Sequence, residues 1–213
     1  MNKKVTAVVL ASVLASPMMM ARISMAGGDK GSLEFEKGFC IAAAPVALSG
    51  GKLKCLATDT RGEAEVEYSQ RTKNGITKTK LSAEVELKVP AVNGATGTLP
   101  TDAAITITPL LTPAGPGGIP AATFGTPITC TFVNPPTVKD VLSKAIPPAS
   151  PVLLATKVEF EGRLSQSSDT GVAATSTLTR DGDVSTPPLL AGSQVTVFVD
   201  GAAVVTGTLK LDD

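Results

Sequence analysis

The sequence predicts a mainly β protein with the architecture of an antiparallel β-sandwich, and a β-barrel is the alternative that the same pattern allows. Short segments in which apolar and polar residues alternate are separated by turn residues, which is typical of half-buried strands. Thr and Val recur along these segments, and both favour a pleated strand over a helix. Only 3% of the 213 residues are aromatic, so we expect aliphatic side chains to form the core.

The first residues have the organisation of a secretory leader of the bacterial type. Lys3 and Lys4 form a positively charged start. Residues 5–16 form an apolar run that is too short to cross a bilayer, and Pro17 ends it. This order of charge, apolar run and helix breaker predicts a signal peptide rather than an N-terminal core helix.

A cleavage site follows the apolar run. Ser24 and Ala26 supply small residues at the positions that a signal peptidase requires before Gly27. We therefore expect residues 1–26 to be cleaved as a signal peptide and residues 27–213 to fold as a single mostly-β domain. The predicted location is periplasmic or extracellular, with no integral membrane segment after cleavage.

The clearest local signal is a hairpin about Asn74-Gly75. Both central residues of a type I′ turn need positive φ, and Asn-Gly is a pair that adopts such angles readily. Apolar positions alternate with polar ones on either side of the turn, so one face of the hairpin is predicted to be buried. Its apolar positions are Ala64, Val66, Tyr68, Leu81, Ala83, Val85 and Leu87.

Further strands follow from the same alternation. A second hairpin about Asp200-Gly201 is predicted near the end of the chain. The strands expected outside the two hairpins are 33–39, 52–57, 104–108, 128–133, 152–164 and 172–179.

Two segments interrupt the strand pattern. Residues 109–127 are rich in Pro and Gly and predict a long surface loop, which is either a connector or a ligand-binding loop. Residues 137–146 predict one short helix, with Thr137 as the N-cap and Pro147 as the stop signal. The apolar face of this helix would consist of Val138, Val141, Leu142 and Ala145.

Three cysteines remain after the predicted cleavage. In an oxidising compartment one disulfide is expected, which leaves one thiol over. Cys40–Cys55 is the preferred pair because Gly50-Gly51 can fold the intervening segment back on itself, and Cys55–Cys130 is the alternative because both cysteines lie in strand patterns. The remaining thiol is interpreted as a buried apolar side chain, or else as a link to a partner or a second copy.

The outward face of the Asn74-Gly75 hairpin combines an acidic base with a basic tip. Its charged residues are Glu63, Glu65, Glu67, Glu84 and Glu86 at the base, and Arg71, Lys73, Lys78 and Lys80 toward the tip. A two-residue turn places Glu65 opposite Glu84, and Glu63 opposite Glu86. Like charges that face each other across strands cost up to about 1 kcal/mol per pair.

Three interpretations of this charge pattern are open. The face is simply solvated, or it protects an edge against uncontrolled strand pairing. Alternatively, the cluster of Glu63, Glu65, Glu84 and Glu86 collects a divalent cation such as Ca²⁺, which prefers carboxylate oxygens. In the third interpretation, the acidic base of one copy meets the basic tip of another in a head-to-tail association.

Composition excludes several classes of function. The chain contains no His, which removes Ser-His-Asp and Cys-His catalysis and the usual zinc sites. The net charge of the full chain is +0, and loss of Lys3, Lys4 and Arg22 leaves 16 basic against 19 acidic residues, a net of −3. A mildly acidic chain with few aromatic residues is unsuited to binding nucleic acid.

We therefore expect no enzyme activity and no cofactor. The predicted function is that of an exported, non-catalytic structural or interaction protein of the cell surface, the periplasm or an extracellular assembly. It would act through strand edges and the charged hairpin, with a protein partner or by self-association. The alternative is a secreted or periplasmic module that binds a small ligand or a cation.

Overall fold

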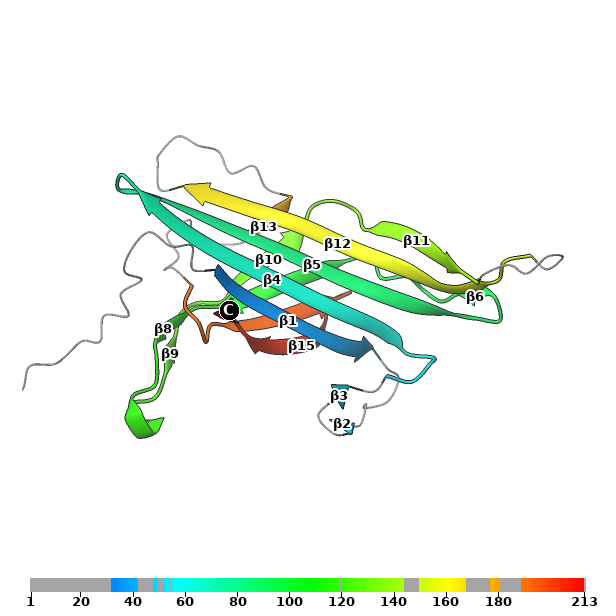
Figure 1. The fold of residues 1–213 in the computed structure, drawn as a ribbon, viewed down its shortest axis with the longest axis horizontal. Helices are drawn as coiled ribbons and strands as arrows, with labels where there is room; N and C mark the ends of the chain where they lie inside the picture. Colours follow the sequence, from blue (N-terminus) through cyan, green and yellow to red (C-terminus); the bar gives the residue numbers. More distant parts are fainter. Residues whose placement is uncertain are drawn as a thin grey trace, which may run out of the picture.

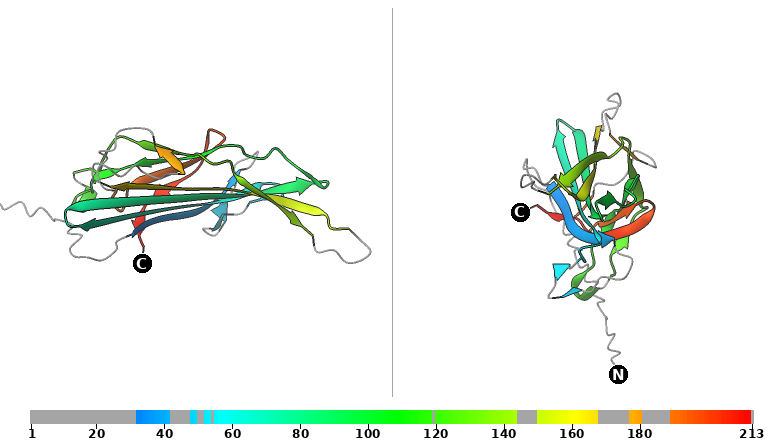
Figure 2. Two further views of the ribbon diagram at one scale, coloured as in Figure 1. Left: turned by 90° about the horizontal axis from the view of Figure 1, so that it is seen from above. Right: turned by 90° about the vertical axis from the view of Figure 1, so that its right-hand side faces the viewer.

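The computed structural model describes residues 32–41, 48–49, 52–53, 55–118, 120–143, 150–167, 177–180 and 189–212. In this part of the chain, antiparallel strands form two sheets that stack face to face (Figures 1 and 2). The predicted leader and the Gly50-Gly51 turn lie outside the described residues.

The larger sheet contains the long strands, which run along the length of the molecule in Figure 1. Its strand order is β11-β12-β5-β4-β1-β16, and β6 pairs with the far end of β5. The bounds are β1 Ser32–Ile41, β4 Thr60–Lys73, β5 Ile76–Val92, β6 Ala95–Thr96, β11 Thr137–Leu142, β12 Leu153–Ser167 and β16 Lys210–Leu211.

The smaller sheet covers one face of the larger sheet. Its order is β13-β10-β7-β14-β15. The bounds are β7 Ala103–Thr108, β10 Ile128–Phe132, β13 Leu178–Arg180, β14 Gln194–Val199 and β15 Ala202–Thr208. Two short ribbons lie outside the sheets, namely β2 Leu48–Ser49 with β3 Lys52–Leu53, and β8 Leu110–Thr112 with β9 Thr123–Phe124.

The core forms where alternate side chains of both sheets point toward each other. Val85 and Leu87 of the larger sheet are fully buried, as are Ile105 and Val197 of the smaller sheet. The strands β11 and β16 end one sheet, while β13 and β15 end the other, so the sheets are not closed on each other. The β-sandwich prediction is therefore confirmed, and the barrel alternative is wrong.

Both predicted hairpins are present with the predicted turns. Asn74 and Gly75 have φ angles of 53° and 77°, and Asp200 and Gly201 have φ angles of 46° and 77°. These positive angles are those that a type I′ turn requires. Every apolar residue predicted for the inner face of the first hairpin is buried.

The predicted helix at 137–146 is wrong, because Thr137–Leu142 is the edge strand β11. Its β-branched residues favour a strand, and pairing with β12 satisfies backbone groups that would otherwise form an open edge. The helical spacing of the apolar residues was misleading, since Val138 and Leu142 are exposed rather than buried. Residues 144–146 lie outside the described residues.

The predicted loop at 109–127 is only partly a loop. Leu110 pairs with Phe124 and Thr112 pairs with Thr123, so β8 and β9 form a ribbon that projects from the sandwich (Figure 1). The 3-10 turn η1, Pro116–Gly118, lies toward its end. Pro113, Pro116, Gly117 and Gly118 therefore lie in the connection between the two strands, whereas Pro109, Gly125 and Pro127 lie outside the ribbon.

Most of the other predicted strands are confirmed with small changes at their ends. The segments 33–39, 104–108, 128–133 and 152–164 correspond to β1, β7, β10 and β12. The prediction at 52–57 is too long, because β3 ends at Leu53 and a turn follows Leu56. Of 172–179, only residues 177–179 are described, and β13 begins there at Leu178.

A tight turn at Asn93-Gly94 was not predicted either. Asn93 and Gly94, with φ angles of 54° and 77°, reverse the chain between β5 and β6. Within the described residues, no helix has the length and apolar composition needed to cross a membrane.

Candidate functional site: the charged face of the larger sheet

The face of the larger sheet that points away from the smaller sheet carries most of the charged side chains of the long strands. We call the outward face of β1, β4, β5 and β12 the charged face. Residues alternate between the two faces of a strand, so the outward positions are those between the buried ones. The acidic band, at the centre of this face, consists of Glu34, Glu36, Glu63, Glu65, Glu67, Glu84, Glu86, Glu159 and Glu161.

Strand register aligns these glutamates in rows that cross the sheet. In the central row, Glu36 of β1 faces Glu65 of β4, which faces Glu84 of β5, which faces Glu161 of β12. The predicted oppositions of Glu65 with Glu84 and of Glu63 with Glu86 are therefore confirmed. The row is longer than predicted, because β1 and β12 each add a carboxylate to it.

Cations flank the acidic band at both ends of the strands. The basic tip consists of Arg71, Lys73, Lys78 and Lys80, and these residues are exposed. Arg71 of β4 faces Lys78 of β5 near the turn. At the opposite end lies the basic row, which consists of Arg61, Lys88, Lys157 and Lys139. The charged face therefore alternates basic, acidic and basic along the strand direction.

Some of the acidic band is neutralised within the protein. Lys157 Nζ lies 2.8 Å from Glu86 and 3.2 Å from Glu159, and Arg163 lies 3.1 Å from Glu161. Among the described residues, no Lys or Arg forms an ion pair with Glu65 or Glu84. The repulsion between Glu65 and Glu84 at the centre of the band is therefore not offset by an ion pair.

Partial burial, together with this repulsion, raises the pKa of the central carboxyls. Partial burial is the main cause for Glu65, and the nearby carboxylates of Glu67 and Glu84 add to the rise in its pKa. For Glu84, partial burial is the largest cause of the raised pKa, and the negative charge of Glu159 is the next largest. The positive charge of Lys157 opposes this rise. Both side chains are half-buried, so water screens their charges only in part.

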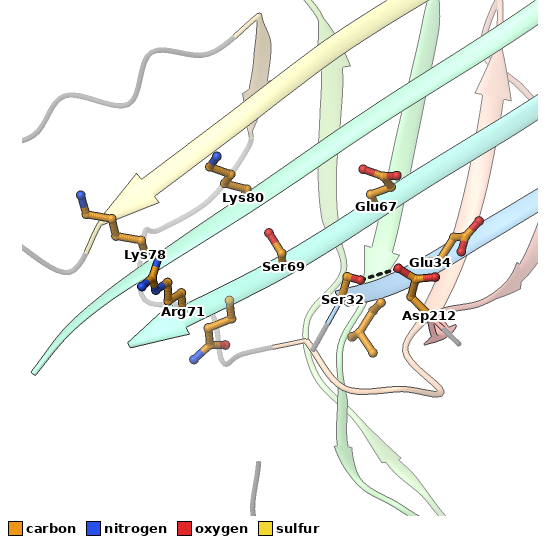
Figure 3. Close-up of a pocket in the computed structure, with 10 residues that line it drawn as sticks. Ser32, Glu34, Glu67, Ser69, Arg71, Lys78, Lys80 and Asp212 are labelled. Carbon is orange, nitrogen blue, oxygen red and sulfur yellow. Dashed lines mark hydrogen bonds between the residues drawn. The ribbon is translucent and has the colours of Figure 1, made fainter. Parts of the chain in front are cut away.

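A groove of about 780 Å³ lies where the basic tip meets the acidic band (Figure 3). Arg71, Lys78 and Lys80 lie toward one side of it, and Glu67 and Glu34 lie toward the other. Short side chains separate the two sides, since Ser69 of β4 faces Ser32 of β1. Ser32 Oγ donates a hydrogen bond of 2.7 Å to the carboxylate of Asp212, which also lines the groove.

A smaller hollow of about 200 Å³ lies over the acidic band beside Glu65 and Glu84. Ser82 forms part of its wall and donates a hydrogen bond of 3.2 Å to Glu67. Within the described residues, no three His, Cys, Asp or Glu side chains are grouped as ligands of a metal ion would be. Binding of Ca²⁺ by Glu63, Glu65, Glu84 and Glu86 stays an untested prediction.

The cysteines lie away from the centre of the charged face. Cys40 and Cys55 form a disulfide with a Cα–Cα distance of 5.6 Å, which confirms the preferred pair and removes the Cys55–Cys130 alternative. Cys130 is buried in the core, with 1% of its surface exposed. Burial supports the interpretation of this thiol as an apolar core side chain.

The sequence predicted the charges of β4 and β5 but missed those of β1 and β12. Glu34 and Glu36 alternate in β1, and Glu159 and Glu161 alternate in β12, each with an apolar residue between them. This alternation is the same signal that identified the outward face of the hairpin. The strand order that places these glutamates beside the hairpin could not be read from local patterns.

Comparison with known proteins finds no matching family, no matching curated protein and no matching solved structure. The geometry and charge of the face are therefore the basis for the functional conclusion.

Proposed function

We propose that the protein is an exported, non-catalytic structural or interaction protein whose partner docks on the charged face of its larger sheet. The observation that carries this proposal is the row of Glu36, Glu65, Glu84 and Glu161, aligned across the sheet without an ion pair at its centre. Facing like charges destabilise a sheet. A partner that supplies positive charge would remove that cost on binding, so the bound state is favoured over the isolated one.

The leader and the disulfide support export. Residues 1–26 have the pattern of a cleaved signal peptide, and Cys40 pairs with Cys55. Disulfides persist in the periplasm and outside the cell, whereas reducing systems remove them in most cytosols.

A strand edge offers a second region of contact. In the described part of the chain, β11 ends the larger sheet and pairs with β12 alone. Val138 and Leu142 of β11 are exposed, as is Leu154 of β12. An edge with exposed apolar side chains can pair with a strand of another molecule.

Carbodiimide cross-linking in the exporting cell tests this proposal. The reagent forms covalent bonds between carboxylates and lysines that are in contact. Docking on the charged face should therefore give cross-linked adducts between the mature chain, which begins at Gly27, and its partner. Glu65→Arg with Glu84→Lys should abolish these adducts, because it reverses the charge at the centre of the row. The control is Arg61→Glu with Lys88→Glu, which reverses a facing pair of cations on the same two strands outside the acidic band and should leave the adducts in place.

The proposal is wrong if the chain keeps its leader and stays in the cytosol. It is also wrong if no adduct forms, or if the two variants and the native protein give the same adducts.

The groove supports a second candidate function, that of a module that binds a small ligand. Its volume of about 780 Å³ is in the range of ligand sites, and it has cations on one side and carboxylates on the other. A zwitterion such as a free amino acid or dipeptide would match both sides. A panel of these compounds should raise the melting temperature of the native protein but not that of the Arg71→Glu, Lys78→Glu variant. No rise with any member of the panel would remove this candidate.

A further inference from the structure

We infer that the partner of the charged face is a second copy of this chain, stacked face to face about a twofold axis. This inference rests on the proposed function, and it names the partner that the face would bind. It follows from the spacing of the basic tip and the acidic band along the two central strands.

On β4, outward residues of opposite charge lie at equal distances on either side of a midpoint between Glu67 and Ser69. Arg71 lies two residues beyond Ser69, and Glu65 lies two residues before Glu67. Lys73 and Glu63 are the next outward pair at equal distances. Successive outward residues of a strand are roughly 7 Å apart, so each pair is symmetric about that midpoint.

On β5, the same relation holds about the midpoint between Lys80 and Ser82. Lys78 lies two residues on one side of this midpoint, and Glu84 lies two residues on the other. The two midpoints coincide across the sheet, because Ser69 faces Lys80 and Glu67 faces Ser82. One axis therefore relates the charges of both strands.

A twofold axis through these midpoints, perpendicular to the strands and parallel to the face, places each acidic band over the other basic tip. Arg71 then faces Glu65 of the second copy, Lys78 faces Glu84, and Lys73 faces Glu63. The twofold repeats each contact, so both copies satisfy the same charges. An association of this kind closes at two copies, unlike the head-to-tail arrangement.

The shape of the face fits this arrangement. Stacked sheets lie about 10 Å apart with their strands about 30° from parallel, and Arg, Lys and Glu side chains are long enough to meet across that gap. The groove of about 780 Å³ adjoins the midpoint, where Ser69 and Ser82 lie opposite Lys80 and Glu67. Short side chains there leave room for the side chains of the second copy.

Mixing two charge-reversed variants tests this inference directly. The tip variant is Arg71→Glu with Lys78→Glu, and the band variant is Glu65→Arg with Glu84→Lys. Each variant alone opposes like charges at four contacts, so its dimer dissociation constant should rise at least about thirtyfold at low salt. Mixed in equal amounts, the two variants complement each other and should form a heterodimer with near-native affinity. Light-scattering mass on a sizing column measures all three samples.

The heterodimer also shows that both variants are folded, and circular dichroism of each variant alone checks this independently. The control variant with Arg61→Glu and Lys88→Glu should dimerise like the native protein, because these residues lie beyond the overlap. Two results would overturn the twofold arrangement. One is that the tip variant or the band variant alone dimerises as tightly as the native protein, and the other is that the two variants do not dimerise when mixed.

The outcomes separate this inference from the proposed function. A native protein that is monomeric at low salt and high concentration overturns the second copy as the partner. If adducts that depend on Glu65 and Glu84 still form in the exporting cell, the proposed function survives with a different partner. If those adducts are absent as well, both proposals fail.

Discussion

Glu65 and Glu84 face each other at the centre of the acidic band, and burial and neighbouring carboxylates raise the pKa of both. A raised pKa means that the folded state binds protons more readily than the unfolded state does. Their contribution to stability is therefore fully present below the unfolded-state pKa and is lost as the pH rises through the folded-state pKa. At neutral pH the two charged side chains destabilise the fold.

We predict that Glu65→Gln with Glu84→Gln raises the melting temperature at pH 7 by about 1–3 °C, because one facing pair of like charges costs up to about 1 kcal/mol. The gain should shrink as the pH falls into the acidic range, where the native carboxyls take up protons at a higher pH than they do in the unfolded chain. Differential scanning calorimetry across this pH range measures both effects.

The control for this pair is Glu63→Gln with Glu86→Gln, which removes another facing pair in the next row. Glu86 forms an ion pair of 2.8 Å with Lys157, so its loss should give no gain in melting temperature. Equal gains from both double variants would contradict the assignment of the repulsion to the central row.

Gly62 is required because the ring of Phe39, on the neighbouring strand, packs directly against it. A Cβ at this position would overlap that ring, whereas a Cβ at Gly38 would have its nearest neighbour at 3.8 Å. We predict that Gly62→Ala lowers the free energy of unfolding by about 1–3 kcal/mol through overpacking. Gly38→Ala should leave it unchanged or raise it slightly. Denaturant unfolding of both variants measures this difference, and equal effects would show that Phe39 does not require a glycine there.

Among the structural elements, the hairpin of β4 and β5 was predictable in detail and β11 was not. Asn74-Gly75 fixes the turn and therefore the register, from which the opposition of Glu65 and Glu84 follows. The helical spacing at 137–146 is not tied to a turn that fixes the pairing of the chain. Thr137–Leu142 is a strand because it pairs with the edge of β12. Local periodicity fails at an edge strand because pairing with a distant segment outweighs it.

The Cys40–Cys55 disulfide joins the end of β1 to the segment that precedes β4. It closes a loop with a sequence separation of 15 residues. A loop of this length contributes about 3 kcal/mol in the chain-entropy description. Cys40→Ala with Cys55→Ala should therefore lower the free energy of unfolding by about this amount.

Guanidinium unfolding of the double variant tests this prediction, and reduced native protein is the control that keeps both side chains. Reduction should destabilise the native protein by a similar amount and should leave the double variant unaffected. A double variant as stable as the oxidised protein would contradict a structural role for the disulfide.

For the molecule as a whole, the charges of the larger sheet are segregated rather than mixed. The sequence predicted the acidic base and basic tip of one hairpin, because alternation and a tight turn are local features. It did not predict that Glu36 and Glu161 extend the central row, because their neighbours depend on the order of strands in the sheet. That order is set by packing between segments far apart in the chain.

The central claim is that the charged face is an interaction surface, and that its partner is a second copy. The most direct test is the light-scattering mass of native residues 27–213 as a function of salt. We predict twice the monomer mass at low salt and the monomer mass at about 1 M salt, where exposed charges are screened within about 3 Å. Because Cys130 is buried, a reductant should not abolish the dimer. A monomer at every salt concentration, or a dimer that salt does not weaken, would contradict the account.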